Sequence, residues 1–443
     1  MKKYRVIFES YEEGFDDSAT KTVIMEGLVK TPEDIFSLGF SQEEQIGLIQ
    51  VLQDNLLGEQ SALFDGDEYC PHCKNCKMVK NGKRISDYHD VLTDHKLSLN
   101  RYRCKKCNYE PGSTVLKLLG TTLSGDLIRI QTELGSNYSY RESQEIFSKF
   151  SSKDRFINNH DRIKHTLEGV GEQVDKLQKI ENEILKIEPA KELILNVDGG
   201  HINTTEEGKR SFEAMTTVVY RPESLVSNDK DTRNHLTSKH CAASAKSDGN
   251  EQIINNTIIA ALKQGLSTQT AITALCDGAA NCWQVVDALK PLAASTICIL
   301  DWFHLAMKIK NISLPEKFKL KLTKIKWHLW RGRSDNAIIR LDSLIEEAPK
   351  NCQDRLNKLK TYIENNADKI VNYRERQKQG LVFTSNLAES TVESLINQRC
   401  KGQQHMRWSR EGIEPLLQLR AAIASNDWKD IWKTAVLNSV AIH

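Results

Sequence analysis

Three apolar runs of strand length, each closed by an aspartate, constrain the fold of this chain more than any other feature. They lie in LILNVDGGHI (193–202), TAITALCDG (270–278) and STICILDWFH (295–304). Because their apolar residues are continuous rather than alternating, the strands are expected to be buried on both faces of a sheet. The patterns between and before them predict a mixed sheet with helices packed on it. Strands are expected at 211–220 and near 235–245, and helices at 251–266 and 281–289.

Asp198 and Asp277 are the first two candidate active-site residues. A carboxylate inside an apolar strand is costly, so each aspartate is expected at a strand end, where Gly199 and Gly278 follow. A helix or turn cap would explain either one alone. Together they favour a site for Mg²⁺ or Mn²⁺, which takes oxygen ligands and relieves the repulsion between neighbouring carboxylates.

A third acid is expected downstream, in a segment rich in basic residues. Glu389 and Glu393 are four residues apart and share one face of a predicted helix, so either can be the third ligand. Residues 308–333 carry nine Lys or Arg against Glu316 alone, and Arg399, Lys401, Arg407 and Arg410 follow. Since the net charge of the whole chain is only +2, this local excess favours a DNA contact over a merely solvated helix face.

Five of the eleven cysteines lie between residues 70 and 107, and four of them form two Cys-x2-Cys pairs. The pairs are Cys70 with Cys73 and Cys104 with Cys107. This spacing is typical of a tetrahedral zinc site built from two tight turns. Cys76 repeats the spacing and His72 is a further possible ligand, so the choice is open, with Cys70 and Cys73 preferred.

The region around these cysteines, 66–117, is expected to form a basic zinc-ribbon module. Residues 70–117 hold eleven Lys or Arg against four Asp or Glu, a local net charge of 11 − 4 = +7. We therefore expect Arg101 and Arg103 to lie against DNA phosphates. A purely structural role for the zinc is the alternative. The run NGK at 81–83 suits a hairpin turn.

Three helical patterns after this module predict a helix-turn-helix DNA-binding domain over 118–175. The helices are expected at 124–134, 139–150 and 154–167, the third capped by Ser151. Arg155, Arg162 and Lys164 of the presumed recognition helix are expected to contact DNA. A charged helical connector follows at 176–190. Residues 1–65 form a separate α/β segment with short β-like runs and a helix from 41 to about 64.

Length and composition exclude several classes of protein. The 443 residues, 39% of them hydrophobic, suffice for two or three domains, which excludes a disordered or fibrous chain. No run approaches the roughly 18 apolar residues of a membrane helix, no signal peptide is evident, and the cysteines do not form a disulfide scaffold. We expect a cytoplasmic protein with no membrane partner.

From Val197 onward the chain resembles the DDE transposases of bacterial insertion sequences, especially the ISKra-type group and its ISL-type relatives. CDGAA followed by LDWFH is the most specific part of the resemblance. The matching phrases, in family order, are VDGGHI (197–202), CDGAANCW (276–283), ILDWFHLAMKI (299–309), AES (388–390), QRCKG (398–402), MRWSREG (406–412) and LLQLRAA (416–422).

The resemblance implies a mixed α/β multidomain protein with a ribonuclease-H-like catalytic domain over 191–443. Its first acid lies on strand one, its second after strand four and its glutamate on a later helix. By motif position these are Asp198, Asp277 and Glu389, with Glu393 as the alternate. The last two acids are 389 − 277 = 112 positions apart, which indicates an all-α insertion at about 308–381.

Asp301 and His304 are also typical of the family. Asp301 could replace Asp277 as a ligand, and His304 could orient a phosphate. We favour a supporting structural role for both.

The function implied is that of a DNA transposase. Such an enzyme binds the inverted-repeat ends of its element, hydrolyses the phosphodiester with two metal ions and joins the freed 3′-OH to target DNA. A homodimer or higher oligomer on double-stranded DNA is expected. Two alternatives are a DNA-binding regulator that has lost cleavage, and a ribonuclease-H-like nuclease or resolvase without strand transfer.

Overall fold

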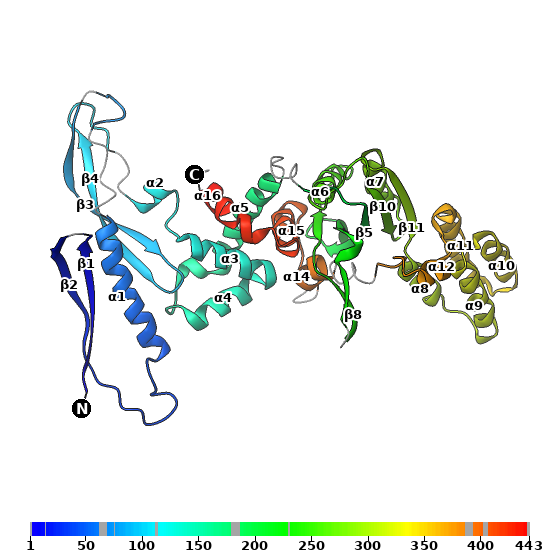
Figure 1. Cartoon of the computed structure of the whole chain (residues 1–443), viewed down its shortest axis with the longest axis horizontal. Helices are drawn as coiled ribbons and strands as arrows, with labels where there is room; N and C mark the ends of the chain where they lie inside the picture. The colour runs from blue at the N-terminus through cyan, green and yellow to red at the C-terminus, as the bar shows by residue number, and fades with distance from the viewer. Residues whose placement is uncertain are drawn as a thin grey trace. The chain divides into compact units, whose positions relative to one another are not determined.

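The structure is a computed structural model of the chain. It describes residues 2–13, 15–61, 69–74, 76–110, 114–178, 187–228, 231–385, 393–401 and 406–440. The chain forms two compact units, one of residues 1–173 with 432–443 and one of residues 174–431 (Figure 1). None of the helices among the described residues combines the length and the apolar character needed to cross a membrane.

The first unit begins with a two-stranded ribbon and a helix. Strand β1 (Tyr4–Glu12) pairs antiparallel with β2 (Phe15–Leu28), and helix α1 (Gln42–Gln60) follows. Ser41 caps α1 in a capping box with Glu44. The predicted β-like runs and the predicted helix are therefore confirmed.

A β-hairpin forms the body of the cysteine module. Strand β3 (Met78–His89) pairs antiparallel with β4 (Asp94–Cys104). The NGK run is not the hairpin turn that the sequence suggested, because it lies inside β3, where the pairing register shifts and Gly82 takes a φ of 82°. The turn lies at 90–93 instead, where the Asp90 carboxylate accepts hydrogen bonds from the N–H groups of Leu92 and Thr93.

Four helices complete this region, and a small core joins three of them. The core consists of Leu127, Phe147, Ile157 and Ile163. Ser124 and Ser139 cap α3 and α4 as N-terminal residues. The helices are α2 (Val115–Leu119), α3 (Gly125–Asn137), α4 (Tyr140–Phe150) and α5 (His160–Gln178), with a 3₁₀ turn, η2 (Phe156–Asn158), before α5.

The third helix of this set begins later than the sequence indicated. Ser151 does not cap it, because the Ser151 hydroxyl donates to the carbonyl oxygen of Phe147 and ends α4. Asn159 takes the capping role, with its side-chain oxygen accepting from the N–H groups of Asp161 and Arg162. Helix α5 then continues through Gln178, so it also includes the start of the expected connector.

Arg155 is buried, which corrects the expectation that it contacts DNA. Its side chain is only 2% exposed. The guanidinium donates at 2.7–2.9 Å to four acceptors, the Asp94 carboxylate and the carbonyl oxygens of Asp90, Val91 and Thr93. It therefore ties the hairpin turn to the helical region. Arg162 and Lys164 are exposed and remain candidates for DNA contact.

Replacing Arg155 with alanine is expected to lower the free energy of unfolding by about 3 kcal/mol, because several acceptors lose a charged donor. Burial raises the pKa of Asp94, but hydrogen bonds from His89 and Arg155 outweigh it and bring the pKa to about 2. The stability contributed by Asp94 is thus present above its unfolded pKa of 3.8 and lost as the pH falls through about 2.

Urea unfolding at pH 7 and at pH 3 measures this effect. The variant should show a weaker acid dependence than the wild type. Arg162→Ala is the matched control, since Arg162 is exposed and should change stability by no more than about 0.5 kcal/mol. Equal losses in the two variants would contradict the structural role of Arg155.

The second unit is built on a five-stranded mixed sheet, as predicted. In chain order β5 is its first strand and β10 its fourth. Strands β11, β10 and β5 run parallel, whereas β6 and β9 continue the sheet antiparallel. In spatial order the strands are β11 (Ser295–Leu300), β10 (Ala271–Cys276), β5 (Glu192–Asn203), β6 (Ser211–Tyr220) and β9 (His240–Ser244).

Helices cover the sheet and one of its edges. Helices α6 (Glu251–Lys263) and α7 (Ala280–Leu289), both predicted, pack on the apolar strands in one buried core. Helix α15 (Arg410–Ala424) lies along β9, where Gln418 donates to the carbonyl oxygen of Ala243. This contact protects the edge strand. A hairpin of β7 (Leu225–Asn228) and β8 (Asp231–Leu236), not predicted, joins β6 to β9.

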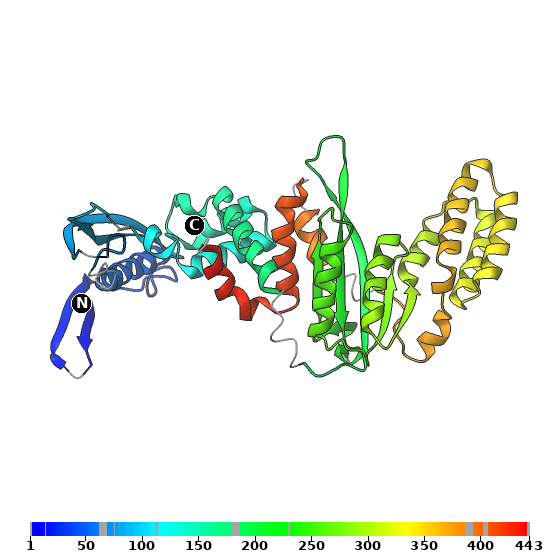
Figure 2. The same cartoon turned by 90° about the horizontal axis from the view of Figure 1, so that it is seen from above.

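Between Trp302 and Lys378, where every residue is described, the regular secondary structure is entirely helical. The predicted third strand ends earlier than expected, because Asp301 caps the first of these helices. In both views the helices at 316–365 stand beyond strand β11 (Figures 1 and 2). They are α8 (Trp302–Lys310), α9 (Glu316–Trp330), α10 (Ser334–Glu347), α11 (Lys350–Asn365) and α12 (Tyr373–Lys378). The last elements are η7 (Glu393–Asn397), α14 (Gln398–Cys400) and α16 (Trp428–Val440).

Candidate functional site

Asp198 and Asp277 line one small cavity at the carboxyl ends of neighbouring parallel strands. Strands β5 and β10 pair up to Val197 opposite Cys276, and each aspartate is the next residue. Asp198 does not end its strand, as had been expected, because β5 continues to Asn203 paired with β6 alone. The cavity, about 10 Å³ in volume, has the size of a single water molecule.

Both glycines that follow Asp198 leave room for a neighbouring side chain. A Cβ atom on Gly199 would overlap the Glu213 carboxylate, and a Cβ atom on Gly200 would lie 2.9 Å from Cδ1 of Ile396. Ile396 follows Glu393 by three residues. The Asp-Gly-Gly motif therefore lets the segment after Glu393 pack against β5, two residues beyond Asp198.

The loop that carries Asp277 is held by the helical region. Gly278 adopts a φ of 93°, a conformation that favours glycine. The Tyr362 hydroxyl on α11 donates to the carbonyl oxygen of Asp277 at 2.6 Å. Helix α11 thus contacts the backbone of the second candidate acid directly.

The electrostatics of the cavity disfavour the ionised form of Asp198. Burial raises the pKa of Asp198, and the Asp277 and Asp301 carboxylates raise it further, while His304 and the N–H of Gly199 act in the opposite direction. The Gly199 N–H donates to Asp198 at 2.8 Å. A half-buried carboxylate that faces other carboxylates is in the situation that a divalent cation relieves.

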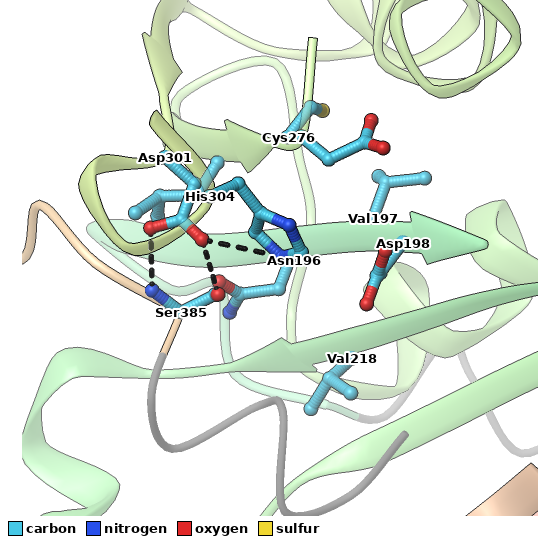
Figure 3. Close-up of a pocket in the computed structure, with 10 residues that line it drawn as sticks. Asn196, Val197, Asp198, Val218, Cys276, Asp301, His304 and Ser385 are labelled. Carbon is cyan, nitrogen blue, oxygen red and sulfur yellow. Dashed lines mark hydrogen bonds and ion pairs between the residues drawn. The ribbon is translucent and has the colours of Figure 1, made fainter. Parts of the chain in front are cut away.

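Asp301 is engaged in structural hydrogen bonds (Figure 3). Its side chain is 1% exposed and lies 3.5 Å from Nε2 of His304. One carboxylate oxygen accepts from the N–H groups of Phe303 and Ser385 at 3.1 and 3.0 Å, and the other accepts from the Ser385 hydroxyl. Because both oxygens already have donors, a supporting role fits Asp301 better than replacement of Asp277 as a ligand.

Of the two candidates for the third acid, only Glu393 lies among the residues that the structure describes. Glu389 lies outside the described residues. Glu393 begins η7, a turn of π-helix, rather than lying on a regular helix, and its exposed side chain accepts a hydrogen bond from Asn397. Burial lowers the pKa of Lys401, and the charges of Glu393 and Asp198 oppose this shift. Lys401 thus lies within electrostatic reach of both carboxylates.

Arg399 is buried, which corrects its expected role as a DNA contact. It is 1% exposed, and its guanidinium lies over the Trp408 ring, 5.1 Å from the centroid. Lys401 is half-buried and Arg407 is exposed, so these two remain candidates. Arg410 donates to the carbonyl oxygen of Ala245 at 2.6 Å.

The four predicted cysteine ligands converge. The Sγ atoms of Cys70, Cys73, Cys104 and Cys107 all lie within 4.8 Å of one another, and two of the separations are 3.6 Å. Tetrahedral zinc with bonds of about 2.3 Å requires separations of about 3.8 Å. This cluster can therefore hold a structural metal such as zinc.

Two left-handed residues shape the turns of the cysteine cluster. Lys74 and Asn108 have φ values of 55° and 57°, and their N–H groups donate to the carbonyl oxygens of Cys70 and Cys104. Cys76 is not part of the converging set, and the His72 ring instead stacks on Tyr109 with centroids 5.7 Å apart.

Arg101 and Arg103, which precede Cys104 in the chain, differ in how available their side chains are for a DNA contact. Arg101 pairs with Glu110, with its Nε donating at 2.6 Å, and its side chain is 38% exposed. Arg103 is exposed. Arg103 is therefore the freer of the two for a phosphate.

Two residues of the candidate site were missed in the sequence, Ser385 and Tyr362. Ser385 lies in an irregular segment and Tyr362 within a regular helix. No spacing links either residue to an aspartate. Their contacts with Asp301 and Asp277 span 84 and 85 residues of sequence, so only the folded chain reveals them.

The region that holds this cavity matches a known family. The model of the Uncharacterised protein family (UPF0236) matches residues 133–433, which is 301 of the 443 residues. The chain belongs to this family. The UPF0236 region begins inside α3, so it includes the cavity with both aspartates but not the cysteine cluster. No curated protein matches the chain.

Proposed function

We propose that this chain is a DDE-type DNA transposase that binds the inverted repeats of an insertion sequence, cleaves the strand at their ends and joins the 3′-OH to target DNA. The observation that carries the proposal is the meeting of Asp198 and Asp277 at one cavity. They come from the first and fourth strands, in chain order, of a mixed five-stranded sheet. These are the positions that the resemblance to ribonuclease-H-like transposases implies.

The donor set of the cavity fits Mg²⁺ or Mn²⁺. Asp198 and Asp277 offer carboxylate oxygens, and the third acid is Glu389 or Glu393. Ions held by these carboxylates would supply positive charge to the attacking and leaving oxygens of a phosphodiester. Asp301 holds Ser385, and with it the start of the segment that leads to both glutamates.

The exposed and half-buried basic residues of both units support a DNA partner. Those kept as phosphate contacts are Arg103, Arg162, Lys164, Lys401 and Arg407, with Arg101 as a weaker candidate. In the proposal the cysteine module acts as a zinc ribbon and α3 to α5 act as the helix-turn-helix. A homodimer or higher oligomer would place two such sites on the two ends of the element.

A strand-transfer assay tests the proposal. The purified full chain is incubated with Mg²⁺ and a labelled duplex that carries the inverted repeats flanking its gene. Nicking at the repeat end followed by joining to a target plasmid is the expected result. Binding without nicking would favour a regulator, and nicking without joining a nuclease or resolvase; either outcome would overturn the proposal.

Removing the hydrogen bonds between Asp301 and Ser385 is expected to weaken metal binding. Ser385→Ala and Asp301→Asn should each raise the Mg²⁺ concentration needed for half-maximal nicking about tenfold, since partners of ligand-bearing segments typically contribute 10–100-fold. Ser343→Ala, at an exposed serine on α10, is the control and should change nothing. An unchanged Mg²⁺ dependence in Ser385→Ala would show that the Asp301 network serves folding alone.

A further inference from the structure

A cationic hollow lies on the α9–α10 hairpin, and the site described above does not use it. Four of its lining residues, Lys324, Trp327, His328 and Arg331, come from α9 and its C-terminal cap and recur at spacings of three and four, so they share one helix face. Arg340 of α10 completes the lining. The hollow has a volume of about 340 Å³, which is large enough for part of a ligand.

The cations of this hollow are not neutralised within the described residues. No ion pair is made there by Lys324, Arg331 or Arg340, whereas the neighbouring Lys319 and Lys321 pair with Glu316 and Glu347. Burial and the charges of Arg340, Arg333 and Arg331 lower the pKa of His328. The hollow is thus a concentration of positive charge that an anion would relieve.

Trp327 gives the hollow a second property. It is 53% exposed, and it is the one exposed residue among the seven tryptophans, all of which are described. Trp330, three residues on, is by contrast packed against Trp302 and Tyr373 at centroid distances of 4.6 and 6.0 Å. The indole of Trp327 is therefore available to a ligand rather than used in the core of the helical region.

An accessible aromatic face among unpaired cations is the combination that binds single-stranded nucleic acid. The cations neutralise phosphates, and the ring stacks on a base. In a duplex the faces of the bases are covered by their neighbours, so an indole can stack only on a base that has left the helix or was never paired. The arrangement therefore favours a single strand over a duplex.

We propose that the α9–α10 hollow binds an unpaired stretch of DNA, with Lys324, Arg331 and Arg340 on its phosphates and Trp327 stacked on a base. The choice of DNA over RNA rests on the proposed function, in which strand cleavage and joining expose unpaired nucleotides. The binding itself requires no cleavage. Each part of the proposal can therefore fail without the other.

Fluorescence anisotropy of a labelled 12-nucleotide oligo-dT with the full chain tests the stacking. Trp327→Ala is expected to weaken binding about tenfold, within the range known for one base–aromatic stack, and Trp327→Phe should restore most of the loss. Leu320→Ala is the control, because Leu320 is a similarly exposed apolar residue of α9 outside the hollow. It should bind as the wild type does.

The salt dependence of the same titration tests the phosphate contacts. Arg331→Ala and Arg340→Ala should each lower the slope of log K against log salt by about 0.7, while Trp327→Ala should leave the slope unchanged. Lys319→Ala removes a paired cation of α9 outside the hollow and should also leave it unchanged.

Three results would overturn the proposal. In the first, Trp327→Ala binds oligo-dT as tightly as the wild type does. In the second, Trp327→Ala loses as much affinity for a 12-base-pair duplex as for oligo-dT. In the third, the wild type binds oligo-U RNA more than tenfold more tightly than oligo-dT. Strand transfer measured in parallel separates the two proposals. If the wild type carries out strand transfer but Trp327→Ala binds oligo-dT as tightly as the wild type, only the proposal for the hollow is rejected. If the wild type shows no strand transfer but Trp327→Ala weakens oligo-dT binding, only the transposase proposal is rejected.

Discussion

Asp198→Asn and Asp277→Asn are each expected to abolish strand cleavage, with a loss of about a thousandfold or more, while binding to repeat DNA stays within about twofold. A thousandfold loss corresponds to about 4 kcal/mol of transition-state stabilisation. An amide in place of either carboxylate removes a charged oxygen ligand from the cavity. The aspartates make no favourable contact with phosphates, so their neutralisation should not weaken binding, and it can even tighten it.

A gel-shift titration paired with cleavage of a pre-nicked repeat end measures both quantities. Asp287→Asn is the matched control, because Asp287 lies on the surface of α7, pairs with Lys290 and undergoes the same change of charge. It should keep both binding and cleavage. Loss of binding together with cleavage in Asp198→Asn would contradict the separation between the cavity and the proposed DNA-binding surfaces.

The thermal stability of Asp198→Asn shows whether the variant is folded. The pKa of Asp198 is raised in the folded state, so its contribution to stability is present below the unfolded pKa of 3.8 and lost as the pH rises through the folded value. At pH 7 without Mg²⁺ the asparagine variant should therefore melt no earlier than the wild type. Any gain should shrink as the pH falls toward 3.8. Added Mg²⁺ should stabilise the wild type alone.

Cys104→Ser is expected to abolish metal binding at the cysteine cluster and to unfold the β3–β4 module. Structural zinc in small modules contributes an apparent binding free energy of about 10–16 kcal/mol, most of it coupled to folding. Cys104 is fully buried within the cysteine cluster and ends β4. The loss of one thiolate should therefore lower the zinc content well below one ion per chain and expose this region to proteolysis.

Two measurements test this prediction: the metal content, by atomic emission, and the resistance to limited proteolysis. Cys76→Ser is the matched control, because Cys76 lies in the same module but outside the converging set. It should retain one zinc ion and resist protease as the wild type does. Equal zinc content in the two variants would show that the four cysteines are not the ligands.

Features set by a few adjacent residues could be read from the sequence. The cysteine pairs converge as their spacing predicts, because each turn is closed by hydrogen bonds within five residues, such as Lys74 N–H to Cys70. The apolar runs before Asp198 and Asp277 became neighbouring strands, because continuous burial is written directly into their composition. Ser124 and Ser139 likewise cap their helices through residues three positions on.

Whether a given charged or aromatic side chain is buried or exposed depends on the tertiary structure. Arg155 and Arg162 look alike in the sequence, yet Arg155 is buried because its acceptors lie about 61–65 residues away, at the β3–β4 turn. Trp327 and Trp330 differ in the same way, since one faces the hollow and the other packs against Tyr373. Periodicity and capping are properties of a short segment, whereas the burial of a charge requires partners that distant segments supply. The sequence alone therefore determined most of the helices and strands and favoured the four cysteines that converge. Only the folded chain decided which polar groups are structural and which are available for binding.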